Sequence, residues 1–261
     1  MVWMLAKVSP LDEVTTKVIF GQPPFVFTSH MFMITLATIL LLVVMPLALR
    51  RKGMVLGGFG NAIEAICLYL REEVVRPFLH DKTDKYIGYL WTMFYFILTI
   101  NLLGMVPLTR IVWMVTGGKE NHFGGAATAN IYVTGTMALA AFFLFHIAGI
   151  KENGIVHYIK SFSPKVPWPM MPFMFFMEVV SSFVRMFSLA IRLFANILAG
   201  HVLLGTLLLL IIIYHNAFVA TASTLFVVAM SMMELFVAFL QAYIFTFLTT
   251  IFIGLAVNPD H

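Results

Sequence analysis

Long runs of apolar residues, separated by short polar segments, dominate this chain and predict membrane-spanning helices. A helix needs about 20 apolar residues to cross about 30 Å of hydrocarbon. Three runs of suitable length lie at residues 30–49, 87–108 and 126–150. With two longer runs near the C-terminus, they predict an all-α, polytopic membrane protein with five transmembrane helices.

Residues 60–79 show a different pattern, with apolar side chains at helical spacing and charged side chains mainly on the other side. The apolar positions are Ile63, Ile66, Cys67, Leu70, Val74 and Phe78, and the charged ones are Glu64, Arg71, Glu72 and Arg76. This pattern predicts an amphipathic helix lying on the membrane surface. Packing of its apolar face against a soluble partner is the alternative.

The two C-terminal runs, 173–214 and 217–257, contain no proline. A single helix of this length would extend about 60 Å, twice the hydrocarbon thickness. Each run is either two short helices or one long, steeply tilted helix, and the absence of Pro, Asp and Lys favours the long helix. We expect a single membrane domain over residues 1–261, with residues 1–29 forming an outer N-terminal segment.

Composition supports the membrane assignment and narrows the function. Of the 261 residues, 61% are hydrophobic and 11% charged, too few polar groups to cover a soluble globule. A soluble enzyme, a disordered chain and a nucleic-acid-binding module are therefore excluded. The single cysteine, Cys67, cannot form an internal disulfide, and no Cys/His cluster has metal-site spacing, so we expect no metal and no cofactor.

Basic residues outside the apolar runs predict the orientation of the chain. With the N-terminus outside and the C-terminus inside, the inner segments carry ten of them, namely Arg50, Arg51, Lys52, Arg71, Arg76, Lys82, Lys85, Lys151, Lys160 and Lys165. The outer segments carry four, namely Lys7, Lys17, Arg110 and Lys119. The positive-inside rule therefore favours a cytoplasmic C-terminus.

The last two predicted helices contain ionisable residues at membrane depth, where each costs at least about 2.5–3.5 kcal/mol and usually marks function. They are Glu178, Arg185, Arg192, His201 and Glu234, accompanied by Asn196 and Gln241. At about 100° per residue, one stripe of the penultimate helix carries Glu178, Ser181, Arg185, Ser188, Arg192 and Asn196. His201 faces away from Arg192. On the last helix, Ser231, Glu234, Ala238 and Gln241 share a face.

Arg192 has no acidic neighbour within a turn or two of its helix, and its guanidinium stays charged at any accessible pH. A carboxylate on another subunit is the natural partner, which indicates function at a protein contact inside the membrane. Simpler interpretations apply elsewhere in the stripe. Ser181 and Ser188 could bind a neighbouring helix, and Arg185 could pair with Glu178 or Ser181.

Three segments resemble subunit a (subunit 6) of F-type ATP synthases. They are SLAIRLFANILAGH from Ser188 to His201, LQAYIF from Leu240 to Phe245 after Glu234, and INLLGMVP from Ile100 to Pro107. The resemblance covers nearly the whole chain. It implies a non-catalytic stator subunit of an H⁺-transporting ATP synthase, with two long tilted helices against the c-subunit ring. It also implies peripheral-stalk b-type subunits, other synthase subunits and membrane lipid as partners, with no nucleic acid.

The same resemblance implies a role for each polar group. Arg192 matches the essential arginine that faces the ring carboxylates and separates two aqueous half-channels. Asn196, His201, Glu234 and Gln241 match the outer half-channel, and Glu178 matches an acidic position near the inner one; Arg185, Ser188 and Ser231 are further candidates. Some members carry the acid and the histidine at positions 201 and 234 in exchanged order, which leaves a proton relay intact.

Two other functions stay open from the residues alone. A self-contained secondary transporter would use Arg192 as an anion site, although no internal repeat is visible. A structural subunit of a respiratory membrane complex would use the polar stripe only for docking. The sequence leaves H⁺ or Na⁺ open as the coupling ion, and it leaves the c-ring size open. A bacterial plasma membrane is favoured over the mitochondrial inner membrane.

Overall fold

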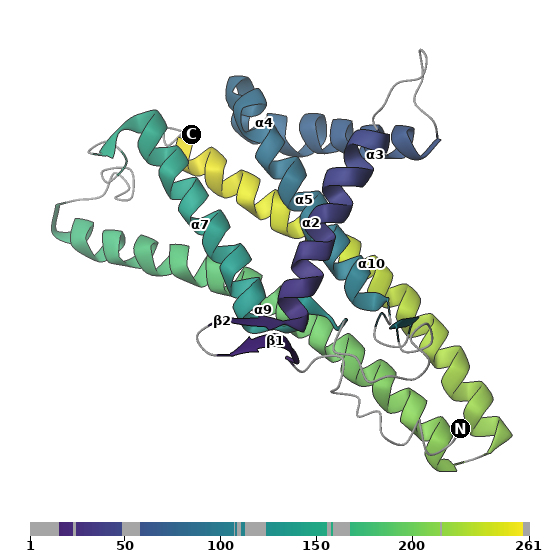
Figure 1. Ribbon diagram of the computed structural model, residues 1–261. Coiled ribbons are helices and arrows are strands. Elements are labelled where there is room, and N and C mark those ends of the chain that lie inside the picture. Colours follow the sequence, from purple (N-terminus) through teal and green to yellow (C-terminus); the bar gives the residue numbers. More distant parts are fainter. Residues whose placement is uncertain are drawn as a thin grey trace. The chain divides into compact units, whose positions relative to one another are not determined.

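The computed structural model confirms an α-helical membrane architecture (Figure 1). It describes residues 16–22, 25–48, 58–106, 108, 111–112, 124–155, 158, 168–214 and 216–257. Most of the predicted outer segment, the basic run at 50–52, Pro107, Lys160, Lys165 and His215 lie outside the described residues. Within the described part, five helical stretches are long and apolar enough to cross a membrane, as the sequence predicts.

The three shorter predicted spans correspond to helices α2, α5 and α7. They occupy Ser29–Ala48, Thr83–Met105 and Ile131–Asn153. The predicted spans at 87–108 and 126–150 are displaced from α5 and α7 by three to five residues. Helix α5 begins earlier and α7 ends later than predicted, because the helices include polar end residues such as Asp84 and Lys151.

Helices α9, Met171–Tyr214, and α10, Ala217–Val257, are each uninterrupted, which confirms that each run forms one long helix (Figure 1). Their tilt in the membrane stays a prediction. At about 1.5 Å per residue, their 44 and 41 residues extend about 60 Å or more. Asn216 caps the N-terminus of α10, since its side-chain oxygen accepts a hydrogen bond from the Phe218 N–H at 2.9 Å.

The chain forms two compact units. The first contains Met1–Leu41, Phe96–Thr134 and Arg192–Gln241, and the second contains Leu42–Tyr95, Gly135–Ile191 and Ala242–His261. Helices α9 and α10 contribute to both units.

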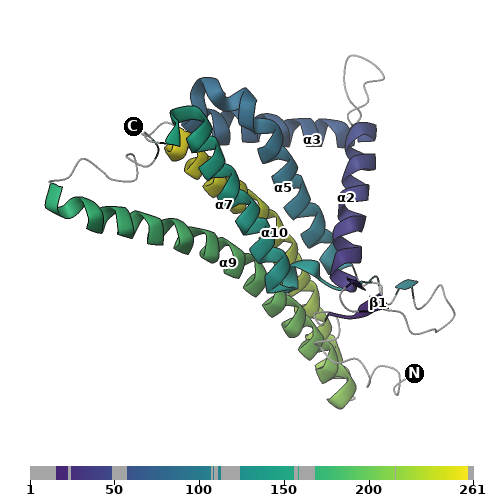
Figure 2. The same cartoon turned by 60° about the vertical axis from the view of Figure 1, so that its left-hand side comes forward.

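The first unit begins with a hairpin that the sequence analysis did not predict. Strands β1, Val18–Gln22, and β2, Phe25–Thr28, pair antiparallel, and the rings of Phe20 and Phe27 stack with centroids 4.8 Å apart. Figure 2 shows the hairpin at the N-terminal end of α2, where the Ser29 N–H donates to the Lys17 carbonyl at 2.9 Å.

The core of the first unit joins α2, α5 and the short 3₁₀ helix η3, Ala127–Ala129. Met33, Ala37, Ile100 and Ala127 form one fully buried cluster. In a second buried cluster, Ala126, directly before η3, and Ala129 pack against Ile197 of α9. Small residues such as these alanines allow close approach of the packed segments, as is common between helices in lipid.

The predicted amphipathic helix at 60–79 is present in the second unit, as three consecutive helical segments. They are α3, Gly58–Tyr69, the π-helical segment η1, Leu70–Val75, and α4, Arg76–Leu79. A 3₁₀ turn η2, His80–Lys82, then leads to α5, and His80 has a φ of 45°. In Figures 1 and 2, α3 runs at a steep angle to α5.

Much of the apolar face of this amphipathic segment packs on the chain's own helices. The Trp91 indole donates to the Cys67 carbonyl at 3.0 Å, and the Tyr95 hydroxyl donates to the Ile63 carbonyl at 3.1 Å. On α10, a Cβ at Gly254 would lie 3.0 Å from the Phe78 carbonyl oxygen, so glycine permits this close contact. The segment is therefore part of the second unit's core.

Candidate functional site

Arg192 lies on α9 with its side chain half-buried. The residues that follow it at positions 193, 197 and 201 form the buried face of this part of the helix, and Asn196 is exposed. Among the described residues, none forms an ion pair with Arg192. Arg192 and Asn196 thus lie outside the packed face that carries His201, in agreement with the predicted separation.

His201 and Glu234 are brought together between α9 and α10 in the first unit. Their atoms Nε2 and Oε1 lie 3.9 Å apart, and each side chain is only 6% exposed. Gly200 makes the space for this pair, because a Cβ there would lie 2.8 Å from Glu234 Oε1. At 3.9 Å the two atoms are beyond hydrogen-bond distance, so a proton could pass between them only after a small side-chain movement or through one bridging water.

Gln241 lies on the same face of α10 as Glu234 and is buried, with Ala238 between them fully buried. The Gln241 Nε2 group has no hydrogen-bond partner among the described residues. Ser231, also predicted on this face, is half-buried and donates to the Val227 carbonyl at 2.9 Å. Ser231 is therefore bonded within its own helix, whereas the Gln241 amide nitrogen is buried without such a bond.

Two further buried polar groups of the first unit carried no predicted role. Asn101 is fully buried on α5, and neither of its amide atoms has a partner in the described part of the chain. The same holds for the Thr128 hydroxyl in η3. Buried polar groups of this kind normally bind ordered water. An asparagine in the middle of an apolar span was the signal that could have identified Asn101.

Glu178 and Arg185 form an ion pair on the second-unit part of α9. Arg185 Nη2 donates to Glu178 Oε1 at 3.1 Å, and Arg185 Nε donates to Ser181 Oγ at 3.1 Å. The guanidinium also lies over the ring of Phe252 on α10, with its carbon 5.4 Å from the centroid. Ser188 is exposed. The pairing of Arg185 with Glu178 and Ser181, considered from the sequence, is what the structure contains.

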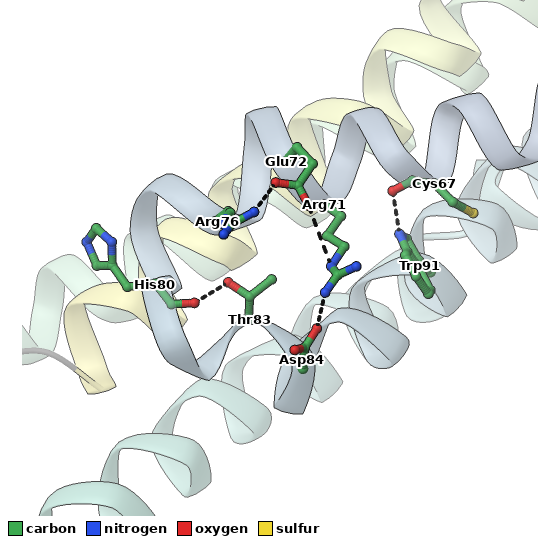
Figure 3. A network of polar contacts seen from close by, with 8 residues as sticks. All are labelled: Cys67, Arg71, Glu72, Arg76, His80, Thr83, Asp84 and Trp91. Carbon is green, nitrogen blue, oxygen red and sulfur yellow. Dashed lines mark hydrogen bonds and ion pairs between the residues drawn. The ribbon is translucent and has the colours of Figure 1, made fainter.

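A second polar cluster joins η1 and α4 to the start of α5 (Figure 3). Arg71 donates to Asp84 at 2.6 Å, and Arg76 donates to Glu72 at 2.5 Å. This hydrogen bond to the Glu72 carboxylate raises the pKa of Arg76. Because these side chains are exposed, the pairs contribute little stability, and they hold the charged face of the amphipathic segment over α5.

A third cluster binds the last turn of α10 in the second unit. The Asn153 amide donates to the Ala256 carbonyl at 2.7 Å, and Lys82 donates to the Val257 carbonyl at 3.4 Å. Glu152 accepts hydrogen bonds from Lys85 and Tyr86. The Asn153 and Lys82 contacts satisfy carbonyls at the C-terminus of α10 that have no partner within the helix.

Comparison with known proteins identifies the chain's relatives. The family profile described as ATP synthase A chain matches residues 31–254. The chain is 36% identical to an ATP synthase subunit a from Anaeromyxobacter sp. over 93% of its length, and it spans 57% of that protein. It is 36% identical over 95% of its length to ATP synthase subunit a 2 from Prosthecochloris aestuarii, of which it spans 74%. For ATP synthase subunit a from Myxococcus xanthus, the identity is 37% over 90% of the chain and 74% of the relative.

Proposed function

Because this chain belongs to the ATP synthase A chain family, we propose that it is the ion-conducting stator subunit a of a rotary F-type ATP synthase. It would conduct ions through two offset half-channels against the c-subunit ring and couple their flow to ring rotation and ATP synthesis. It would perform no catalysis itself. Arg192 is the main support for this proposal. It is a cation without an ion pair among the described residues, and it lies on an uninterrupted helix of 44 residues.

The physical role of Arg192 follows from the cost of charge in lipid. A ring carboxylate must be neutral while it faces hydrocarbon, because an ionised one would cost several kcal/mol or more. Beside Arg192, the opposite charge stabilises the ionised carboxylate and favours proton loss. After it passes the arginine, the carboxylate must be reprotonated before it returns to lipid. The permanent positive charge also opposes direct proton leakage between the half-channels.

We place the outer half-channel along the polar groups of the first unit. His201 and Glu234 would form its buried relay, and Gln241 and Asn196 would bind water or the ring carboxylate on either side. Glu178 would lie near the inner half-channel. This arrangement allows a proton to enter from one side of Arg192 and leave from the other, driven by about 2.3 kcal/mol per charge for each 100 mV.

The helices and the relatives of the chain indicate its location in the cell. The chain is a multi-pass membrane protein, and the relatives named above are bacterial, which supports a bacterial plasma membrane. We propose that the N-terminus is outside and the C-terminus cytoplasmic, from the distribution of basic residues. The proposed partners are the c ring, b-type peripheral-stalk subunits and the other subunits of the synthase.

The test is ATP-driven proton pumping in membranes that carry Arg192→Ala, with assembly measured by co-purification of the c ring. We expect loss of pumping while the ring stays bound. Pumping at the parental rate would show that the arginine only supports packing, and it would overturn the proposal.

A further inference from the structure

Two arginines occupy one stripe of α9, at positions 185 and 192. Seven residues in a helix return the side chain to within about 20° of its starting direction, after about 10 Å of rise. Both guanidinium groups remain charged at any accessible pH. A carboxylate that moves along this stripe could therefore be attracted by either arginine, unless one of them is already neutralised.

The two arginines have different surroundings. Arg185 is held by Glu178 and Ser181 at 3.1 Å each and rests over Phe252. No described residue pairs with Arg192. The Arg185–Glu178 pair has no net charge, and both side chains are about one-third to two-fifths exposed, at 35% and 43%. The stripe therefore presents two guanidinium groups but a single uncompensated positive charge.

We infer that Glu178 is a positioning residue that neutralises Arg185, so that a ring carboxylate meets one uncompensated cation, Arg192. This inference rests on the proposed function and adds to it a condition on specificity. Arg185 has a packing role of its own, because its guanidinium links Ser181 on α9 with Phe252 on α10. Without Glu178, the Arg185 guanidinium would be a second cationic binding site for the ring carboxylate. Each rotational step of the ring would be slower, because the carboxylate would have to dissociate from this site as well.

The experiment is a charge-pair cycle in the assembled ATP synthase, with ATP-driven proton pumping and ring rotation rate as readouts. Glu178→Gln leaves Arg185 uncompensated, and we expect both rates to fall about tenfold, which corresponds to about 1.4 kcal/mol. Glu178→Gln combined with Arg185→Gln removes both charges, and we expect both rates to rise severalfold above those of Glu178→Gln alone. Glu178→Asp keeps the negative charge and should retain most of the rate.

Glu73→Gln is the matched control, because Glu73 is an exposed carboxylate on η1 outside the proposed channel. Co-purification of the c ring shows that each variant assembles. If the double variant is as slow as Glu178→Gln, the carboxyl itself is needed for proton transfer, and the charge-balance role is overturned. A parental rate in Glu178→Gln would overturn it as well. Either result leaves the proposed function standing, since that depends on the separate Arg192→Ala measurement.

Discussion

Gly200 lies against the carboxyl group of Glu234, so closely that a Cβ on the glycine would be 2.8 Å from the Oε1 atom. The glycine precedes His201, whose imidazole is 3.9 Å from the same oxygen. The position of the buried acid is therefore set by the absence of a side chain on the neighbouring helix.

Gly200→Ala should move the Glu234 carboxyl away from its present position, because the clash falls on the end of a flexible side chain. We expect passive proton flux through the membrane sector to fall severalfold. Alanine favours the helix over glycine by about 1 kcal/mol, so thermal stability should not decrease. Gly135→Ala is the control, since a Cβ there meets nothing within 4 Å. Equal fluxes in the two variants would show that the carboxyl position does not limit conduction.

Glu234→Gln should slow passive proton flux by at least about tenfold, because an amide cannot accept and release the proton that the carboxyl would exchange with His201 in the proposed relay. The side chain has nearly the same size, so the packing of α9 on α10 is retained. Proton uptake by vesicles under an imposed potential measures the effect. Unchanged flux would remove Glu234 from the pathway.

Asn153→Ala removes the amide that binds the Ala256 carbonyl at the end of α10. We expect a loss of about 1 kcal/mol in the stability of the second unit, because a buried hydrogen-bond acceptor loses its partner. A thermal scan of the purified complex in detergent should show a lower midpoint. Lys151→Ala, an exposed change in the same helical turn, should leave the midpoint in place.

Cys67 is the chain's single thiol, so its alkylation can be followed without ambiguity. Burial raises its pKa, the hydrogen bond to Tyr95 lowers it, and the nearby Glu64 raises it further. Because the thiolate is the reactive form, the alkylation rate of Cys67 should rise with pH and level off at a higher pH than for a free thiol. Tyr95→Phe removes the hydroxyl that stabilises the Cys67 thiolate. It should therefore shift the pH dependence of alkylation to a still higher pH. A profile matching that of free cysteine would contradict this description.

The apolar pattern was sufficient to predict the spans, because helix length and hydrophobicity act through local sequence. The polar stripe was also predictable, since Glu178, Arg185 and Arg192 recur at helical spacing in an otherwise apolar run. The pairing of His201 with Glu234 required the packing of two helices, which periodicity alone does not determine. The roles of these residues rest on the family resemblance and on the experiments above.

The β hairpin was missed because its strands have only five and four residues, and short apolar runs do not distinguish strand from the start of a helix. The π-helical segment was missed for a related reason. A regular 3.6-residue period was assumed across residues 60–79, whereas Leu70, Val74 and Val75 are all buried together. The extra residue in that turn changes which side chains face inward.

The segment η1 therefore has a consequence for how chains of this family can differ in length. A π-helical turn accommodates one residue more than the surrounding α-helix, and such turns are rare and often functional. Deleting one residue between Leu70 and Val75 would restore regular α geometry and rotate one flanking part by about 100° relative to the other. The Arg71–Asp84 pair and the buried valines could not then both persist. A chain shortened by one residue here would therefore need a different arrangement of charges on the segment.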